Sequence, residues 1–165
     1  MAATNRKGIQ AALKARIAKV DNDVPVVVGP RRLVSFDDLL NWGTVRVRGS
    51  DSSIRKIKVW EVTRSAATDI KAGGTGVPIT HVRRQHVFTI RGLLSYDEER
   101  DSFEELQVWV DQVMDDLTTN PKLDNVSQAL RILSPSVRLS TQELTSAFLH
   151  VAELELTIEE QYALS

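Results

Sequence analysis

The chain has 165 residues, of which 42% are hydrophobic and 26% are charged, and its formal net charge is −1. These values are typical of one globular domain, spanning 1–165, that buries a core of its own, and they exclude fibrous and disordered chains. The absence of cysteine excludes disulfides, thiolate metal sites and a cysteine nucleophile. We expect no membrane contact, because no apolar run reaches the roughly 18 residues of a membrane span and no signal-peptide pattern opens the chain.

The small net charge hides an uneven distribution along the chain. Residues 1–92 carry 17 Lys and Arg against 7 Asp and Glu, whereas residues 93–165 carry 4 against 15. Either the two halves intermingle in the fold and their charges cancel locally, or the subunit is dipolar and its basic face meets the acidic face of a neighbour. Contacts of the second kind run head to tail, and they close into a ring when the rotation between subunits allows it.

The first quarter of the chain combines helix and strand patterns. Apolar residues recur every three or four positions over 6–20, which predicts an amphipathic helix. A β-branched run predicts a short strand over 24–28. A capping signal then predicts one or two helical turns at 36–41, and apolar and basic residues alternate over 45–48.

A β-hairpin is predicted in the middle of the chain. Residues 54–63 and 83–94 alternate between apolar and polar, as strands with two different faces do. Between them, we expect 65–80 to form a long flexible hairpin loop, because glycine and proline interrupt strands. The residues of this kind are Gly73, Gly74, Gly76 and Pro78.

The second half contains the clearest helix pattern, over 103–119, with a capping box predicted from Ser102 and Glu105. A strand over 130–139, interrupted by a proline, and a terminal strand over 150–159 with one acidic, solvent-facing side follow. These elements predict an α+β fold. Its mixed or antiparallel sheet would carry the N-terminal helix and the second amphipathic helix packed on it.

No pattern in the sequence indicates catalysis, a cofactor or a metal. His81 and His86 have no acidic residue between them, and their spacing does not converge metal ligands. The glycines at 73–76 lack the Gly-Lys-Ser/Thr ending of a phosphate-binding loop. The carboxylates at 98–105 crowd a helix start, where a solvated face is the simpler interpretation. We therefore expect no catalytic, cofactor-binding or metal-ligating residues, and a protein that is not an enzyme.

The basic residues of the first half raise the alternative of a nucleic-acid-binding module, since such residues contact phosphates. No helix-turn-helix, zinc-finger or RNP-type motif accompanies them. Exposure of a pore lining to passing DNA is favoured over sequence-specific binding. The residues in question are Arg31, Arg32, Arg46, Arg48, Arg55, Lys56, Lys58, Arg83 and Arg84.

Three stretches, taken in order, resemble the tail terminators of tailed bacteriophages, the proteins that cap a finished tail tube and join it to the head. The first is RRLVSFDDLL at 31–40, which follows the N-terminal helix. The second is KVWEVTR at 58–64, continued after the loop by RRQHVFTIRG at 83–92. The third is HVAELELTIEE at 150–160, and the helix over 103–119 lies before it, where this family has one.

The resemblance implies a structural virion protein of the tail and neck, assembled in the host cytoplasm as a hexameric ring. Its partners would be further copies of itself, the tail tube protein and the head–tail connector or stopper protein, with DNA passing through the lumen. Interfaces of this family follow shape and charge, so contact residues are expected on charge and flexibility alone. They are Arg31, Arg32, Arg83, Arg84, Gly73, Gly74, Gly76, Glu153 and Glu155. A head-completion or connector ring protein of the same neck is the alternative.

Overall fold

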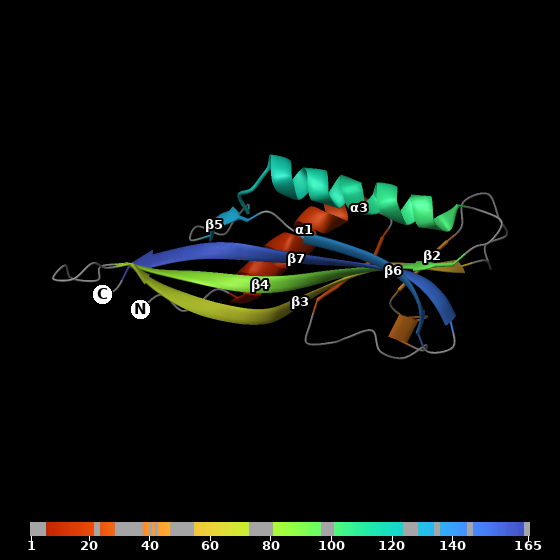
Figure 1. Ribbon diagram of the computed structural model, residues 1–165, viewed down its shortest axis with the longest axis horizontal. Coiled ribbons are helices and arrows are strands. Elements are labelled where there is room, and N and C mark those ends of the chain that lie inside the picture. The colour runs from red at the N-terminus through yellow and green to blue at the C-terminus, as the bar shows by residue number, and fades with distance from the viewer. Residues whose placement is uncertain are drawn as a thin grey trace.

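Two helices cover one face of a long, twisted sheet in the computed structural model of the chain (Figure 1). The structure describes residues 6–21, 24–28, 38–39, 41, 43–46, 55–72, 81–96, 101–123, 129–133, 136–144 and 147–163. The helices are α1 (Arg6–Val20) and α3 (Ser102–Thr119). The strands are β1 (Val26–Val28), β2 (Thr44–Arg46), β3 (Arg55–Ala72), β4 (His81–Ser95), β5 (Ala129–Ile132), β6 (Ser136–Leu144) and β7 (Ala147–Ala163). The predicted α+β fold class, with an N-terminal and a second helix, is confirmed.

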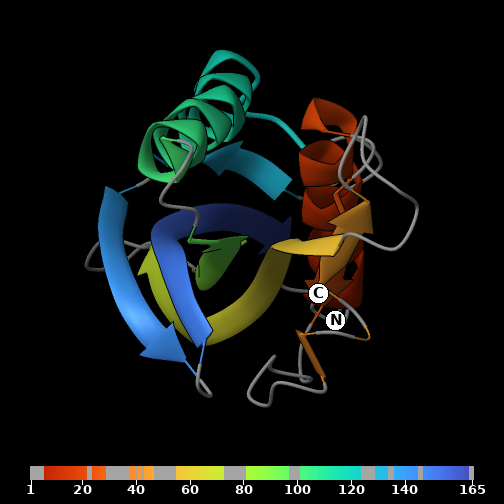
Figure 2. The same ribbon diagram turned by 90° about the vertical axis from the view of Figure 1, so that its right-hand side faces the viewer.

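Three long strands form the centre of the sheet in the order β3, β4, β7, and each pair is antiparallel. β1 runs parallel to β3, so the sheet is mixed, while β2 pairs antiparallel with the start of β3. β5 and β6 both pair with β7 on its other side. Seen along the long axis, the strands are strongly twisted, and α1 and α3 cover neighbouring parts of the sheet (Figure 2).

The main core lies between the two helices and the sheet face they cover. Every second residue of the central strands points into it, among them the fully buried Trp60 and Phe88. Gly92 lies opposite Trp60 in the register, and a Cβ at this position would come 2.6 Å from Cζ3 of the indole. Glycine is therefore needed at this position, because the Trp60 indole packs directly on the backbone. The indole also packs on Trp109, with ring centroids 4.2 Å apart.

A smaller apolar cluster lies on the opposite face, near the start of β3. Leu39 packs there with Val59, Leu93 and Val151, which alternate with the residues of the main core. Of the helical turns predicted at 36–41, residues 38, 39 and 41 are helical, and the others lie outside the described residues. This cluster covers only one end of the opposite face.

The buried side chain of Arg16 joins α1 to the end of α3. Its guanidinium donates to the Asp116 carboxylate (Nε to Oδ2, 2.8 Å) and to the backbone carbonyls of Asp116, Asn120 and Lys122, each at 2.8 Å. The last carbonyls of a helix have no partner within the helix and carry partial negative charge. α3 has no basic residue in its own last turn, so Arg16 supplies the cation from a segment 100 residues earlier.

Three local predictions are corrected by the structure. β3 continues to Ala72, so residues 65–72 of the predicted loop 65–80 are strand, and residues 73–80 lie outside the described residues. The strand continues because β4 offers a paired template past a bulge between Arg64 and Ala66, which overrides weak intrinsic β-propensity.

The other two corrections concern α3 and the strand predicted at 130–139. The N-cap of α3 is Asp101, whose side chain accepts a hydrogen bond from the Glu104 amide, so the capping box predicted from Ser102 and Glu105 is wrong. Ser102 instead lies inside the helix, and its hydroxyl is hydrogen-bonded to the buried His150. The strand predicted at 130–139 is two strands, β5 and β6, which pair with different parts of β7.

Candidate functional site

A row of alternating charges crosses four strands on the sheet face opposite the helices. Glu61 of β3 lies opposite Arg91 of β4, which lies opposite Glu153 of β7, which lies opposite Arg138 of β6. Arg91 and Glu61 form an ion pair at 2.7 Å, with the Glu61 side chain only 3% exposed. Directly opposed unlike charges stabilise neighbouring strands. Glu153 and Arg138 are both exposed, and among the described residues they form no ion pair with each other.

A hollow of about 580 Å³ opens beside this row. Its lining comes from β4, β6 and β7: Thr89, Ser136, Val137, Arg138, Glu153, Leu154 and Glu155. We call it the charged groove. Within the part of the chain that the structure describes, neither carboxylate nor the Arg138 guanidinium has an ion-pair partner. The groove therefore presents two carboxylates, one guanidinium and two hydroxyls to whatever occupies it.

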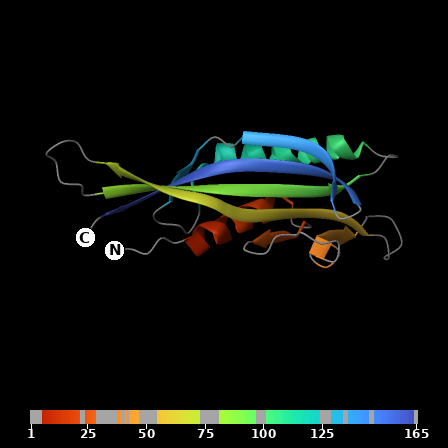
Figure 3. The same cartoon turned by 60° about the horizontal axis from the view of Figure 1, so that its bottom comes forward.

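At the other end of the central strands, the sheet extends past both helices as a narrow arm (Figures 1 and 3). We call residues 64–72 of β3, 81–87 of β4 and 157–163 of β7 the arm, and β5 pairs with its β7 strand where the arm joins the core. Five consecutive residues on β3, Ser65 to Asp69, are exposed, so both faces of this strand meet solvent. No described strand pairs with the outer edge of β3 here, since β1 reaches only Val62.

The arm is fastened to the core by a buried histidine–carboxylate pair. Nε2 of His86 lies 2.8 Å from Oε2 of Glu160, and the two side chains are 0% and 1% exposed. Burial lowers the pKa of His86 below its ordinary value of 6.5. This outweighs the hydrogen bond to Glu160, which raises the pKa, and Arg64 and Arg84 lower it further. A neutral His86 donates from Nε2 to the carboxylate, which leaves Nδ1 as the ring atom without a partner.

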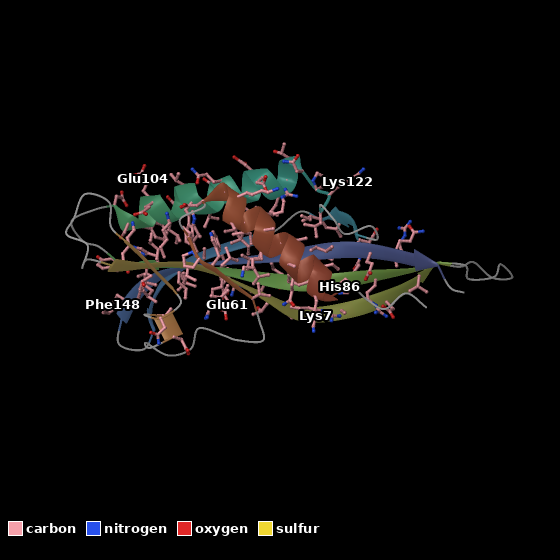
Figure 4. All side chains as sticks on the ribbon, turned by 180° about the vertical axis from the view of Figure 1, so that it is seen from behind. Lys7, Glu61, His86, Glu104, Lys122 and Phe148 are labelled. Atoms are coloured by element: carbon pink, nitrogen blue, oxygen red, sulfur yellow. The ribbon has the colours of Figure 1, made fainter. Side chains whose placement is uncertain are left out.

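A second buried histidine fixes the start of α3. His150 of β7 is hydrogen-bonded through Nε2 to the Ser102 hydroxyl and through Nδ1 to that of Thr141, both at 2.8 Å. Burial lowers its pKa, although Asp101 acts in the opposite direction. The rings of Tyr96 and Phe103 pack on the imidazole at 5.3 and 5.4 Å. Figure 4 shows this end of the sheet, marked by Phe148 and Glu104, away from His86.

The comparisons with known proteins give a likeness in structure and none in sequence. Neither a family model nor a curated protein matches the sequence. The fold is similar to that of the sheath/tube terminator of an extracellular contractile injection system, PVC, solved in its extended state. The identity is 10% and the TM-score is 0.49. The similarity covers 100% of this chain and 58% of that protein, so this chain spans less than two thirds of its length.

The structure separates the predicted contact residues into two places. Glu153 and Glu155 lie together in the charged groove, whereas Arg83 and Arg84 lie on the arm. Arg84 is bound by Asp69 of the same arm, with Nη2 at 2.6 Å from Oδ2. The other predicted contacts, Arg31, Arg32, Gly73, Gly74 and Gly76, lie outside the described residues. Arg138, Thr89 and Ser136 could not be identified from the sequence, because their place beside Glu153 depends on the register of β4 and β6 against β7.

The ion pairs favour local cancellation between the basic and acidic halves of the chain. Arg16 pairs with Asp116, Lys56 with Glu105 at 2.7 Å and Arg83 with Glu159 at 3.9 Å, each a cation of the first half with an anion of the second. The two halves therefore intermingle within one subunit. Fewer charges therefore remain available to a partner than the uneven distribution along the sequence suggests. The charges of the charged groove are among those that remain.

The described residues show neither a metal-ligand cluster nor a membrane helix. Among them, no three histidine or carboxylate side chains come together in a way that could hold a metal ion. No helix in the described segments is both long and apolar enough to cross a membrane.

Proposed function

We propose that the chain is a structural protein, without catalysis, that closes into a hexameric ring on the end of a phage-type tail tube. The ring ends growth of the tube and joins the tail to the head. Its partners are further copies of the chain, the tube protein and the connector or stopper protein of the head, and DNA passes through its lumen. The finished protein resides in the tail and neck of the particle.

The observation that carries this proposal is the exposed stretch Ser65–Asp69 of the arm. A strand that is exposed on both faces and unpaired at one edge gains little from its own subunit, and unpaired strand edges readily pair with another chain. The side chains at 65–67 are serine and alanine, which are small enough for another chain to approach this edge closely. Such a segment fits a subunit that is completed by its neighbours.

The charged groove is the second support for assembly. An enzyme site of this size would be expected to bring a nucleophile or a pair of carboxylates into a dry environment that shifts their pKa values. Here both carboxylates are exposed to solvent and lie beside a guanidinium and two hydroxyls. Polar, solvated groups of both signs are typical of the outer part of a protein–protein interface.

The nucleic-acid-binding alternative is weakened by the partners of the basic residues. Lys56 and Lys58 lie at 2.7 and 3.7 Å from Glu105, and Arg84 is bound by Asp69. Phosphates would have to compete with these carboxylates for the same cations. The other alternative, a connector ring of the neck, would be distinguished from a hexameric ring at the tail end by its number of subunits.

The experiment that tests assembly through the arm is Ala67→Lys. Lysine on an exposed strand edge opposes pairing with another chain, and Ala67 is exposed, so the monomer keeps its fold. The matched control is Gln107→Lys, which adds the same charge on the exposed side of α3. Light scattering coupled to size-exclusion chromatography should show wild type and Q107K as rings and A67K as monomer. A67K that assembles like wild type would contradict the role of the arm.

A further inference from the structure

We propose that the charged groove receives the arm of a second copy of the chain, with that copy's Arg83 facing Glu153 and Glu155. This inference deepens the proposed function and rests on its assumption that copies of the chain assemble. It adds which two surfaces meet, and it identifies the occupant of the groove as the chain itself.

The groove determines the chemistry of its occupant. Glu153 and Glu155 contribute two negative charges and Arg138 one positive charge, and none of the three has an ion-pair partner within the described chain. An apolar occupant would remove these charges from water without replacing their hydration, which is costly. The occupant must therefore be polar and must bring at least one cation. The hydroxyls of Thr89 and Ser136 can bind the backbone of an extended strand beside it.

The arm has the complementary chemistry. The Arg83 side chain is 50% exposed, and its carboxylate partner among the described residues, Glu159, lies at 3.9 Å, which is too long for a hydrogen bond. The neighbouring carboxylates are almost fully buried, since the Glu159 and Glu160 side chains are 9% and 1% exposed. The arm therefore offers a partner mainly its guanidinium. A guanidinium suits carboxylates well, because its planar fork can donate two hydrogen bonds at once.

The two surfaces cannot meet within one subunit. Arg83 lies opposite Gln161 of β7, six residues along the same strand from Glu155. At about 3.3 Å per residue the two positions are roughly 20 Å apart on one rigid sheet. A contact between Arg83 and Glu155 is therefore a contact between copies.

The absence of native cysteine makes a direct test available. The variant R83C/E155C carries one thiol on the arm and one in the groove, and a disulfide requires Cα atoms within about 7 Å. A link is therefore possible only between copies. Mild oxidation followed by non-reducing electrophoresis should give a ladder of linked subunits. The yield should exceed that of the control R83C/Q107C by about tenfold, since only docked thiols have a high effective concentration.

The result separates this inference from the proposed function. A ring seen by microscopy without the R83C/E155C link, or equal linking in the control, would overturn the inference and leave the ring standing. A ladder that stops at two subunits would support docking of arm and groove and would overturn the ring. Charge exchange gives an independent measurement. R83E and E155R alone should each weaken self-association by about tenfold, and R83E/E155R should restore it. Single variants that assemble normally would overturn the inference.

Discussion

Replacing Arg16 by methionine should destabilise the protein strongly, although Arg16 lies far from the arm and the groove. Methionine keeps an unbranched apolar stem and a similar helix propensity but removes every hydrogen bond to the end of α3. The Asp116 carboxylate loses its ion pair, and the carbonyls of Asp116, Asn120 and Lys122 lose the guanidinium as a donor. The Asp116 carbonyl keeps one donor, the Asn120 amide at 3.0 Å, so the loss falls mainly on the carboxylate and on the carbonyls of Asn120 and Lys122.

The magnitude follows from the burial of the two partners. Breaking a buried ion pair by removing one side costs about 3–5 kcal/mol. The lower end applies here, because the Asp116 side chain is 31% exposed and recovers some hydration. We therefore expect Arg16→Met to lower the free energy of unfolding by about 3 kcal/mol. For a chain of this size, that corresponds to a fall in Tm of roughly 6–12 °C.

Urea denaturation followed by tryptophan fluorescence measures this change, since Trp60 and Trp109 are buried in the adjoining core. The control is Lys14→Met, a substitution at an exposed position of the same helix, which should change stability by no more than about 0.5 kcal/mol. Arg16→Lys should fall between wild type and R16M, because it keeps the charge without the fork of donors. A loss below about 1 kcal/mol in R16M would refute the assigned role of the network.

Two further perturbations test the core and the buried histidines. Gly92→Ala should cost about 1–3 kcal/mol of unfolding free energy, because its Cβ would collide with the Trp60 indole. The cost should shrink in a Trp60→Phe background, and an equal cost in both backgrounds by urea denaturation would contradict the collision. His86 and His150 have lowered pKa values, so the folded state binds fewer protons than the unfolded state below pH 6.5. The stability they contribute is complete above pH 6.5 and is lost as the pH falls below it, by at most about 1.4 kcal/mol per pH unit for each histidine. His86→Gln and His150→Gln should each flatten the stability profile measured between pH 7.5 and 5.5, and unchanged slopes would exclude these residues as its cause.

The sequence predicts the elements whose pattern is set by burial on one side. The helix at 103–119 and the strand pattern at 83–94 match α3 and β4 closely, because their apolar residues face one continuous core. The second half of β3 was not predicted. Its residues 65–69 have no buried face, so they are held extended by ladder hydrogen bonds and by the Asp69–Arg84 ion pair to β4, which periodicity does not reveal.

The candidate site was predictable only in part for the same reason. The exposure of Glu153 and Glu155 on the terminal strand follows from alternation along one strand, and their role as contact residues stays a prediction. Their neighbour Arg138 was not chosen, because it comes from β6, and the register between β6 and β7 is set by tertiary packing. His86 and His150 fall within the strands predicted at 83–94 and 150–159, but their partners Glu160 and Ser102 depend equally on contacts between distant segments.

Whether copies of this chain close into a ring can be seen directly by electron microscopy of the purified protein. Class averages over a range of protein concentrations count the subunits around the axis. We expect six subunits around an open lumen, with each arm lying on the next subunit. A two-fold dimer, a ring with a different number of subunits, or particles that remain monomeric at every concentration would contradict this expectation.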